Sequence, residues 1–254
     1  MTREAVELAP GIHVMTSRRF ATTSTVVIAG GEALVVDPCW DADELAGVAG
    51  FLEACDVACA VGLATHLHYD HVLWHPRLGA PPRWASPSAA ARWEQDRISL
   101  IQPLIGDIPD DLVDLAGRVS PLPPEGLPWS GRDTVLHEHD AHARGHLAVE
   151  IADTGVLLAG DMLSDVELPY PDADEPDLTA YLAGLDRLAG AVRRSRVLVP
   201  GHGTPTYAPM ERLDADRHSL DAVLAGRAPD DARLADPDNQ AIHARTVEQA
   251  RATR

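Results

Sequence analysis

The sequence contains few cysteines, few basic residues and no long apolar run. Its 3 cysteines form no C-x-x-C pair, so they predict neither a disulfide framework nor a zinc ribbon. Lysine and arginine total 21 against 39 acidic residues, which leaves a formal net charge of −18. Nucleic-acid affinity rests largely on cationic side chains that neutralise phosphates. A nuclease or another nucleic-acid-binding role is therefore disfavoured.

The apolar segments are too short to span a membrane, and the N-terminal MTREAVELAP lacks the apolar region of a signal peptide. We therefore expect a cytoplasmic protein with a small-molecule substrate and no membrane partner, whose oligomeric state stays open. A chain of 254 residues can bury a full core without disulfides or structural metal ions. Any bound metal is accordingly expected to serve chemistry rather than folding.

Short β-branched runs alternate with helical apolar spacing along the chain. The pattern predicts strands at 11–15, 24–29, 33–36, 57–64, 134–138, 147–151, 156–159 and 197–199. It predicts helices at 41–54 and 177–192. Strands that alternate with helices predict an α/β fold, and we interpret residues 1–254 as a single domain.

Two segments depart from this alternation of strands and helices. Residues 81–128 combine a helical stretch interrupted by Pro103 with a proline-rich stretch, and we interpret them as an insertion that can act as a lid. Residues 210–254 predict a helical C-terminal tail, broken by Pro229 and Pro237.

A dense group of metal-competent side chains follows the strand predicted at 57–64. It comprises His66, His68, Asp70 and His71. In an extended chain the first three alternate onto one face, and the turn that follows can bring His71 back toward the same point. Zinc takes imidazole nitrogen and carboxylate oxygen at about 2.0–2.2 Å. The group therefore predicts one metal site and the beginning of a second.

The segment from Thr65 to His71 reads T-H-L-H-Y-D-H and resembles the H-x-H-x-D-H signature of the metallo-β-lactamase fold superfamily. Further segments follow in the family's order: A-H-A-R-G-H at 141–146, G-D at 160–161 and P-G-H-G at 200–203. The resemblance covers nearly the whole chain. It is strongest to the group that contains glyoxalase II, lactonases and related thioesterases. It implies an αββα sandwich, in which two mixed β-sheets lie face to face with helices outside.

The resemblance also implies a dinuclear centre, for which we expect two zinc ions per chain, with iron or manganese as alternatives. Two cations about 3.5–4 Å apart repel each other, and a shared carboxylate offsets that repulsion. The family's third histidine aligns with His142, and His146 is the alternative because Ala143 replaces the usual threonine. The implied ligands are His66, His68 and His142 for one ion, Asp70, His71 and His202 for the other, and Asp161 between them.

The implied reaction is hydrolysis of an ester, lactone or thioester by a metal-bound hydroxide. Asp70 would be the catalytic residue that orients the hydroxide and helps to protonate the leaving group. One alternative is a mononuclear iron persulfide dioxygenase on the same fold. A second is β-lactamase-type amide hydrolysis, which is disfavoured because true β-lactamases lack the bridging aspartate found here as Asp161.

Several nearby residues have weaker indications. Asp37 resembles the family's aspartate that holds a metal ligand by its free N–H. His146 can touch the substrate or support the third histidine. Tyr170 can donate a hydrogen bond to a bound carbonyl, and Tyr69 can line the substrate pocket. His139 is predicted to lie on the surface of a sheet.

Overall fold

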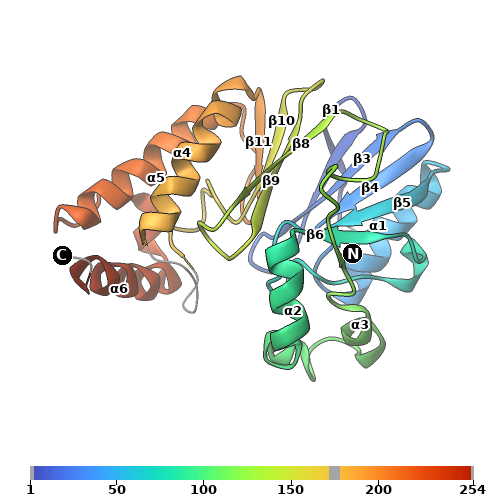
Figure 1. Ribbon diagram of the computed structural model, residues 1–254, viewed down its shortest axis with the longest axis horizontal. Coiled ribbons are helices and arrows are strands. Elements are labelled where there is room, and N and C mark those ends of the chain that lie inside the picture. The colour runs from blue at the N-terminus through green and yellow to red at the C-terminus, as the bar shows by residue number, and fades with distance from the viewer. Residues whose placement is uncertain (1–2, 172–177, 253–254) are drawn as a thin grey trace.

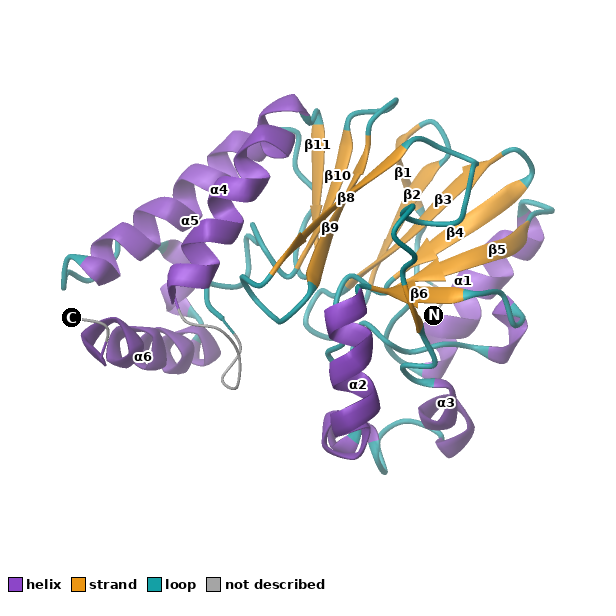
Figure 2. Ribbon diagram, viewed as in Figure 1, coloured by secondary structure: helices purple, strands orange, loops and turns teal. Residues whose placement is uncertain are grey.

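Two β-sheets lie face to face, and helices cover both outer sides (Figures 1 and 2). The computed structural model describes residues 3–171 and 178–252. Helices α4 and α5 cover one outer side and α1 covers the other, while α2 and α3 lie at one end of the molecule. The αββα sandwich expected from the sequence is therefore confirmed.

The first sheet follows the order of the chain. Its first three strand pairs, from β1–β2 to β3–β4, are antiparallel, and its last three, from β4–β5 to β6–β7, are parallel. The seven strands are β1 Val6–Ala9, β2 Ile12–Thr16, β3 Thr23–Ala29, β4 Glu32–Val36, β5 Ala58–Leu63, β6 Arg83–Ala85 and β7 Ser120–Pro121.

The second sheet has the order β11-β10-β9-β8. Its β8–β9 and β9–β10 pairs are antiparallel and its β10–β11 pair is parallel, so this sheet is also mixed. The four strands are β8 Thr134–His139, β9 His146–Ile151, β10 Val156–Gly160 and β11 Val197–Pro200.

Side chains alternate between the two faces of each sheet, as the strand period requires. In β10, Val156 and Leu158 pack into the core between the sheets. Leu157 and Ala159 pack instead with Tyr181 and its neighbours on the helices outside. Because both faces of the strand are covered, β10 reads in the sequence as an unbroken apolar run.

Helices α4 (Leu178–Arg194), α5 (Pro209–Leu224) and α6 (Pro237–Ala252) pack against one another, and α4 packs against β8 of the second sheet. The helical tail expected at 210–254 is thus divided into α5, a short 3-10 turn η3 (Ala232–Ala235) and α6. Pro237 opens α6, where its missing N–H costs no helical hydrogen bond. No helix in the described part of the chain is long and apolar enough to cross a membrane.

Residues 81–128 contribute to the first sheet as well as to helices. Between β6 and β7 the chain forms α2 (Pro87–Leu100), the 3-10 turn η2 (Gln102–Leu104) and α3 (Asp110–Leu115). The Ser86 hydroxyl caps α2 by accepting from Ala89 N–H at 3.2 Å, and it donates to the Gly145 carbonyl at 2.5 Å. This pair of bonds joins the start of α2 to the loop between β8 and β9. On the other side of the molecule, η1 (Pro76–Leu78) packs against α1 (Ala42–Ala54).

The loops after β5, β8, β10 and β11 meet at one edge of the sandwich. Strands β8 and β10 are both antiparallel to β9, and β11 is parallel to β10, so these three strands end at the same edge. The Leu147 N–H of β9 donates to the Thr65 carbonyl after β5 at 2.8 Å, and Thr23 N–H donates to the Gly201 carbonyl after β11 at 2.7 Å. These bonds bring the ends of both sheets together.

Candidate metal centre

All seven candidate ligands come from loops that begin at this edge. The histidine and aspartate group at 66–71 follows β5, His142 follows β8, Asp161 follows β10 and His202 follows β11. Two glycines allow the loops to approach one another. A Cβ on Gly201 would lie 1.9 Å from Asp161 Oδ1, and Gly160 adopts a φ of 56° that favours glycine. The G-D and P-G-H segments therefore meet only because no side chain intervenes.

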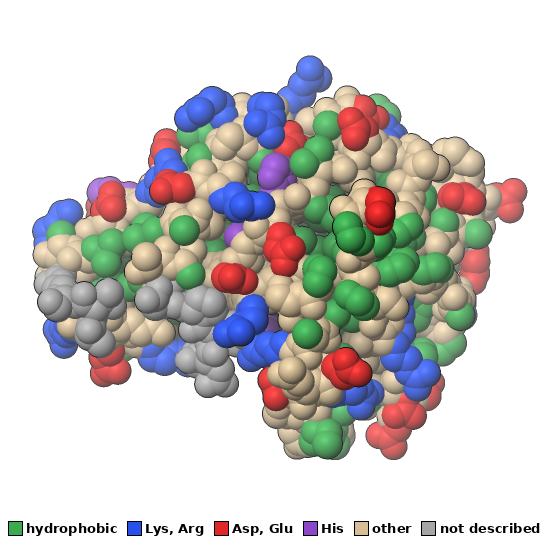
Figure 3. All heavy atoms as spheres, in the orientation of Figure 1, with side chains coloured by type: hydrophobic (Ala, Val, Ile, Leu, Met, Phe, Trp, Pro, Cys, Tyr) green, Lys and Arg blue, Asp and Glu red, His purple; other side chains and the backbone are tan. Residues whose placement is uncertain are grey.

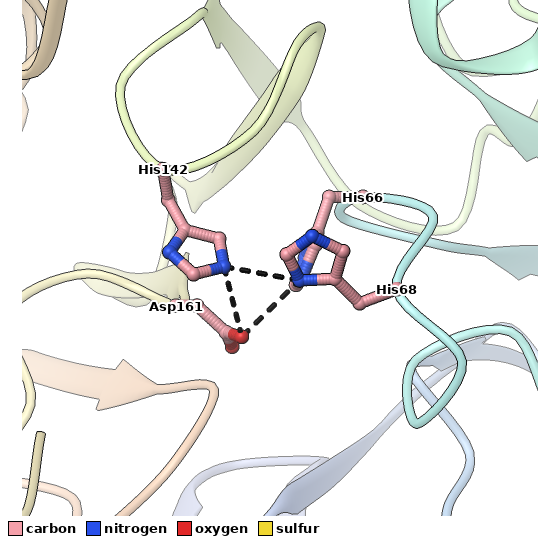
Figure 4. A group of neighbouring side chains, drawn as sticks. All are labelled: His66, His68, His142 and Asp161. Carbon is pink, nitrogen blue, oxygen red and sulfur yellow. Dashed lines mark hydrogen bonds and ion pairs between the residues drawn. The ribbon is translucent and has the colours of Figure 1, made fainter. Parts of the chain in front are cut away.

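The first group of donor atoms combines three imidazoles with a carboxylate (Figure 4). His68 Nδ1 lies 2.9 Å from His66 Nε2 and 3.1 Å from His142 Nε2. Asp161 Oδ2 lies 3.3 Å from His66 Nε2 and 3.5 Å from His142 Nε2. Four ligands at tetrahedral corners about 2.0–2.2 Å from one ion are about 3.3–3.6 Å apart. The donor set and its spacing fit a metal ion.

The second group contains Asp70, His71 and His202. His71 Nε2 and His202 Nε2 are 3.3 Å apart, and Asp70 Oδ2 lies 3.5 Å and 3.2 Å from them respectively. All three side chains are buried. This group also has the composition and spacing of a metal site.

Asp161 lies between the two groups. Its Oδ1 is 3.1 Å from His71 Nε2 in the second group. Its Oδ2 is close to the first group and also 3.3 Å from His202 Nε2. One carboxylate is thus in reach of both groups, which is the arrangement that holds two cations close together.

Hydrogen bonds turn the second ring nitrogen of several histidines away from the centre. Asp37 Oδ2 accepts from His71 Nδ1 at 3.1 Å. The same carboxylate accepts the Thr65 hydroxyl at 2.6 Å and the Thr65 N–H at 2.7 Å. The Thr65 hydroxyl in turn lies 3.1 Å from His66 Nδ1. These bonds fix both rings with Nε2 facing the centre.

His202 and His142 are held by main-chain carbonyls. His202 Nδ1 donates to the Phe20 carbonyl at 3.0 Å, and His142 Nδ1 donates to the Tyr170 carbonyl at 3.4 Å. Sequence reasoning missed Phe20 and Thr65, because any residue provides a carbonyl and threonine is common after a strand.

The structure places His142, rather than His146, among the donor atoms of the first group. The His146 ring stacks on His66 with a centroid separation of 4.9 Å, and its Nε2 accepts from Asp161 N–H at 3.1 Å. His139 stacks on the other side of His146 at 4.7 Å and is 8% exposed. The prediction that His139 lies on the surface was wrong, because α4 covers this face of β8.

The centre has an electrostatic field that attracts positive charge. Burial alone would lower the pKa of His71, but the carboxylates of Asp161, Asp70 and Asp37 raise it well above its usual range. Burial would also lower the pKa of His202, but nearby carboxylates, mainly Asp161, raise it well above its usual range. Burial would raise the pKa of Asp161, yet the neighbouring imidazoles hold it well below its usual range. A field that favours protonated imidazoles also favours bound cations.

A cavity of about 380 Å³ opens onto both groups. Tyr69 and Tyr170 both line it, and their role in substrate binding stays a prediction. The Tyr69 ring packs on Trp40 at 5.5 Å, and the Tyr170 ring lies against His142 at 5.7 Å. The remaining lining residues are Phe20, His68, Asp70, Ser99, Leu100, Pro103, His142, Asp161, Glu167, His202 and Asp238.

Glu167 is a further acidic residue at the centre that sequence reasoning missed. A donor atom of its carboxylate lies within 4.8 Å of those of Asp161 and His202. Burial raises the pKa of Glu167 to about 7, with Asp161 and Asp70 adding to the shift and His202 opposing it. Glu167 follows Asp161 by six residues, and this proximity could have marked it as a candidate site residue. No pattern in the loop, however, indicated that its side chain points toward the centre.

Comparison with known proteins agrees with this fold. Residues 17–202 match the metallo-beta-lactamase superfamily, and the chain belongs to that superfamily. A beta-lactamase domain protein from Burkholderia ambifaria is 18% identical with a TM-score of 0.66, over 87% of this chain and 76% of that one. A metallo-beta-lactamase family protein from Thermus thermophilus is 20% identical with a TM-score of 0.62, over 86% and 83%.

A metallo-beta-lactamase from Pontibacter korlensis is also similar, with 15% identity and a TM-score of 0.63 over 84% of this chain and 95% of that one. At these identities the solved structures establish the fold alone. The comparison with curated proteins gave no match.

Proposed function

We propose that this protein is a dinuclear metal-dependent hydrolase that cleaves an ester, lactone or thioester. The observation that carries the proposal is the position of Asp161, whose two oxygens are 3.3 Å from His66 in one donor group and 3.1 Å from His71 in the other. We expect two zinc ions, held by the two groups and sharing this carboxylate.

The completeness of the second group favours hydrolysis over the mononuclear iron dioxygenase. A dioxygenase with one iron engages fewer of these ligands, whereas Asp70, His71 and His202 here converge as closely as the first group does. Two bound metal ions supply a water of lowered pKa and polarise the scissile carbonyl. The residues of the chain must then bind the substrate and transfer protons to and from it.

Asp70 is the candidate for proton transfer. Its carboxylate lines the cavity and lies 3.2 Å from His202 Nε2. In the proposed reaction one water adds to the carbonyl carbon, the C–O or C–S bond breaks, and a proton reaches the leaving alcohol or thiol. Asp70 can orient the attacking water and relay that proton. The ring of Tyr170, on the wall of the cavity, is the candidate to donate a hydrogen bond to the carbonyl.

The cavity favours substrates whose reacting portion is uncharged. Phe20, Leu100 and Pro103 supply an apolar wall, and Glu167 and Asp238 supply negative charge. No arginine is among the described residues that line the cavity, and the sequence contains no lysine. Anionic groups such as the carboxylate of a β-lactam or of a peptide thioester therefore find no cationic side chain in the described lining.

The test combines metal analysis with a substrate panel. Zinc-loaded protein is assayed on matched lactones, thioesters and aryl esters, and its metal content is measured alongside that of His66→Ala and Asp161→Ala. We expect about two metal ions per chain and hydrolysis in the wild type, with metal content lowered and hydrolysis abolished in both variants.

Two results would overturn the proposal. One is a single iron per chain together with oxygen consumption on a persulfide, which would support the dioxygenase. The other is full hydrolysis by Asp161→Ala.

A further inference from the structure

Hydrogen bonds on both sides hold the main chain of Glu167 in place. Its N–H donates to Ser164 Oγ at 3.0 Å, and its carbonyl accepts from the Arg233 guanidinium at 2.7 Å. Ser164 Oγ in turn donates to the His202 carbonyl at 2.7 Å. The main chain of Glu167 is therefore fixed on both sides, and one of the fixing residues is bonded directly to a candidate metal ligand.

Residues of the C-terminal tail also hold the loop that carries Glu167. Arg233 also donates to the Ser164 carbonyl at 2.9 Å, and Asn239 Nδ2 donates to the Val166 carbonyl at 2.7 Å. Asn239 Oδ1 accepts from Leu168 N–H at 3.3 Å. Both tail residues are more than 60 positions away in the sequence. We call residues 164–168 the clamped loop.

The clamped loop places the Glu167 carboxylate beside Asp161 and His202, since donor atoms of the three residues lie within 4.8 Å of one another. Glu167 Oε1 lies 3.9 Å from His202 Nδ1, and the side chain is 27% exposed. Within the described residues, no arginine lies within ion-pair distance of this carboxylate. The nearest basic group is the His202 imidazole, which is neutral when it binds a metal ion, and the metal ion would then be the cationic partner of this partly buried carboxylate.

We propose that Glu167 is an additional carboxylate ligand for the metal ion held by Asp70, His71 and His202. This rests on the proposed dinuclear centre and concerns how that centre is built. Glu167, Asp70, Asp161 and His202 all line the same cavity, so the carboxylate can reach a metal ion held by the second group.

The extra carboxylate makes the two sites chemically unequal. The first site offers three imidazoles and Asp161, whereas the second offers two imidazoles and three carboxylates. Imidazole suits zinc, and carboxylate suits harder ions such as manganese. Manganese(II) should therefore compete with zinc better at the second site than at the first.

The test is metal binding by Glu167→Gln, which keeps the shape of the side chain and removes its charge. Metal-free wild type and variant are titrated calorimetrically with Zn²⁺ and, separately, with Mn²⁺. We expect one of the two Kd values, that of the first site, to be unchanged. We expect the other, that of the second site, to rise at least about tenfold, since loss of a hydrogen-bonding neighbour of a ligand already costs about 10–100-fold. The loss should be larger for Mn²⁺.

The control is Glu125→Gln, a change at an exposed glutamate outside the cavity, which should bind both metals as the wild type does. Wild-type affinities for both metals at both sites of Glu167→Gln would overturn the proposal. If circular dichroism shows that Glu167→Gln does not fold, Glu167→Asp is used instead. This variant keeps the charge but shortens the side chain by one methylene. Kd values within about twofold of wild type at both sites of Glu167→Asp would then overturn it.

Failure of this proposal is distinguishable from failure of the proposed function. Absence of hydrolysis by metal-loaded wild type would refute the hydrolase assignment, while the calorimetric difference between wild type and Glu167→Gln would still report on the ligand.

Discussion

His142 and His146 are four residues apart and have opposite environments. His142 Nε2 lies 3.1 Å from His68 Nδ1 in the first donor group. His146 accepts from the main-chain N–H of Asp161 and is stacked between His66 and His139. His142 faces the centre, and His146 supports the loop that carries Asp161.

We therefore expect His142→Ala to lose metal from the first site and His146→Ala to retain most of it. His146→Ala should instead lower the free energy of unfolding by about 1–3 kcal/mol, because Asp161 N–H loses its buried acceptor. Metal analysis and urea unfolding of the two variants check both statements. Loss of metal from His146→Ala with retention in His142→Ala would show that the ligand assignment is reversed.

His139 should make the stability of the protein depend on pH. Burial lowers its pKa to about 4, and the charge of Arg187 adds to the shift. A histidine ordinarily titrates near pH 6.5. Because the folded-state pKa is depressed, the neutral ring contributes stability that is present above pH 6.5 and is lost as the pH falls toward 4.

The expected loss on acidification is at most about 3 kcal/mol, at about 1.4 kcal/mol per pKa unit. His139→Phe removes this term, so its free energy of unfolding should fall less than that of the wild type between pH 6.5 and 4. Denaturant unfolding of both proteins over that range, at one fixed metal content, measures the difference. Parallel curves for the two proteins would contradict the prediction.

At the scale of elements, the C-terminal tail matters to the site although, of its described residues, only Asp238 lines the cavity. Its residue Arg233 binds the clamped loop and is 8% exposed. The guanidinium also pairs with Asp216 of α5 at 2.7 Å and with Asp231 at 2.8 Å. A single buried cation thus joins α5, the tail and the loop that carries Glu167.

Arg233→Ala should lower the free energy of unfolding by about 3–5 kcal/mol, because it leaves the carboxylate of Asp216 buried without its partner. The matched control is Arg217→Ala, whose partner Asp186 is 77% exposed, and it should cost at most about 1 kcal/mol. Urea unfolding of the two variants compares them. Similar losses in both would show that the clamp contributes no more than a surface ion pair.

The segment 81–128 contributes strands to the first sheet and helices to the wall of the cavity. Strands β6 and β7 lengthen the first sheet, while α2 and η2 carry Ser99, Leu100 and Pro103 to the wall of the cavity. The hydrogen bond from Ser86 to the Gly145 carbonyl ties the start of α2 to the His142 loop. Whether the segment acts as a lid stays a prediction.

At the scale of the whole molecule, negative charge dominates. The formal net charge is −18, yet acidic, basic and apolar side chains are interspersed over the face shown in Figure 3, with histidines visible near its middle. Selection between substrates by charge must therefore arise in the cavity itself. There the described lining offers Glu167 and Asp238 and no arginine.

We expect an uncharged aryl ester to be hydrolysed with a kcat/KM at least about tenfold above that of a matched ester with a terminal carboxylate, a difference of about 1.4 kcal/mol. Asp238→Asn should narrow this ratio, because it removes a repelling charge from the cavity. Asp186→Asn, at an exposed position outside the cavity, should not change it. Equal kcat/KM values for the two esters in the wild type would refute the charge argument.

The sequence determined the features that depend on local pattern. The strands follow from β-branched runs, and the group at 66–71 lies within six residues, so its convergence needs only a strand end and one turn. The segments around His142, Asp161 and His202 were found because each places a metal-competent side chain directly after a strand. Parallel strand ends share an edge, so strand order fixes that these residues meet.

Only the tertiary structure decided the features that depend on loop conformation and on distant partners. The choice of His142 over His146 depends on which ring faces the centre. The burial of His139 depends on α4, more than 30 residues later in the chain. Glu167 reaches the site because Arg233 and Asn239 of the tail hold its main chain. Such contacts leave no periodic trace in the sequence, because hydrogen bonds to main-chain carbonyls place no demand on the residue that provides them.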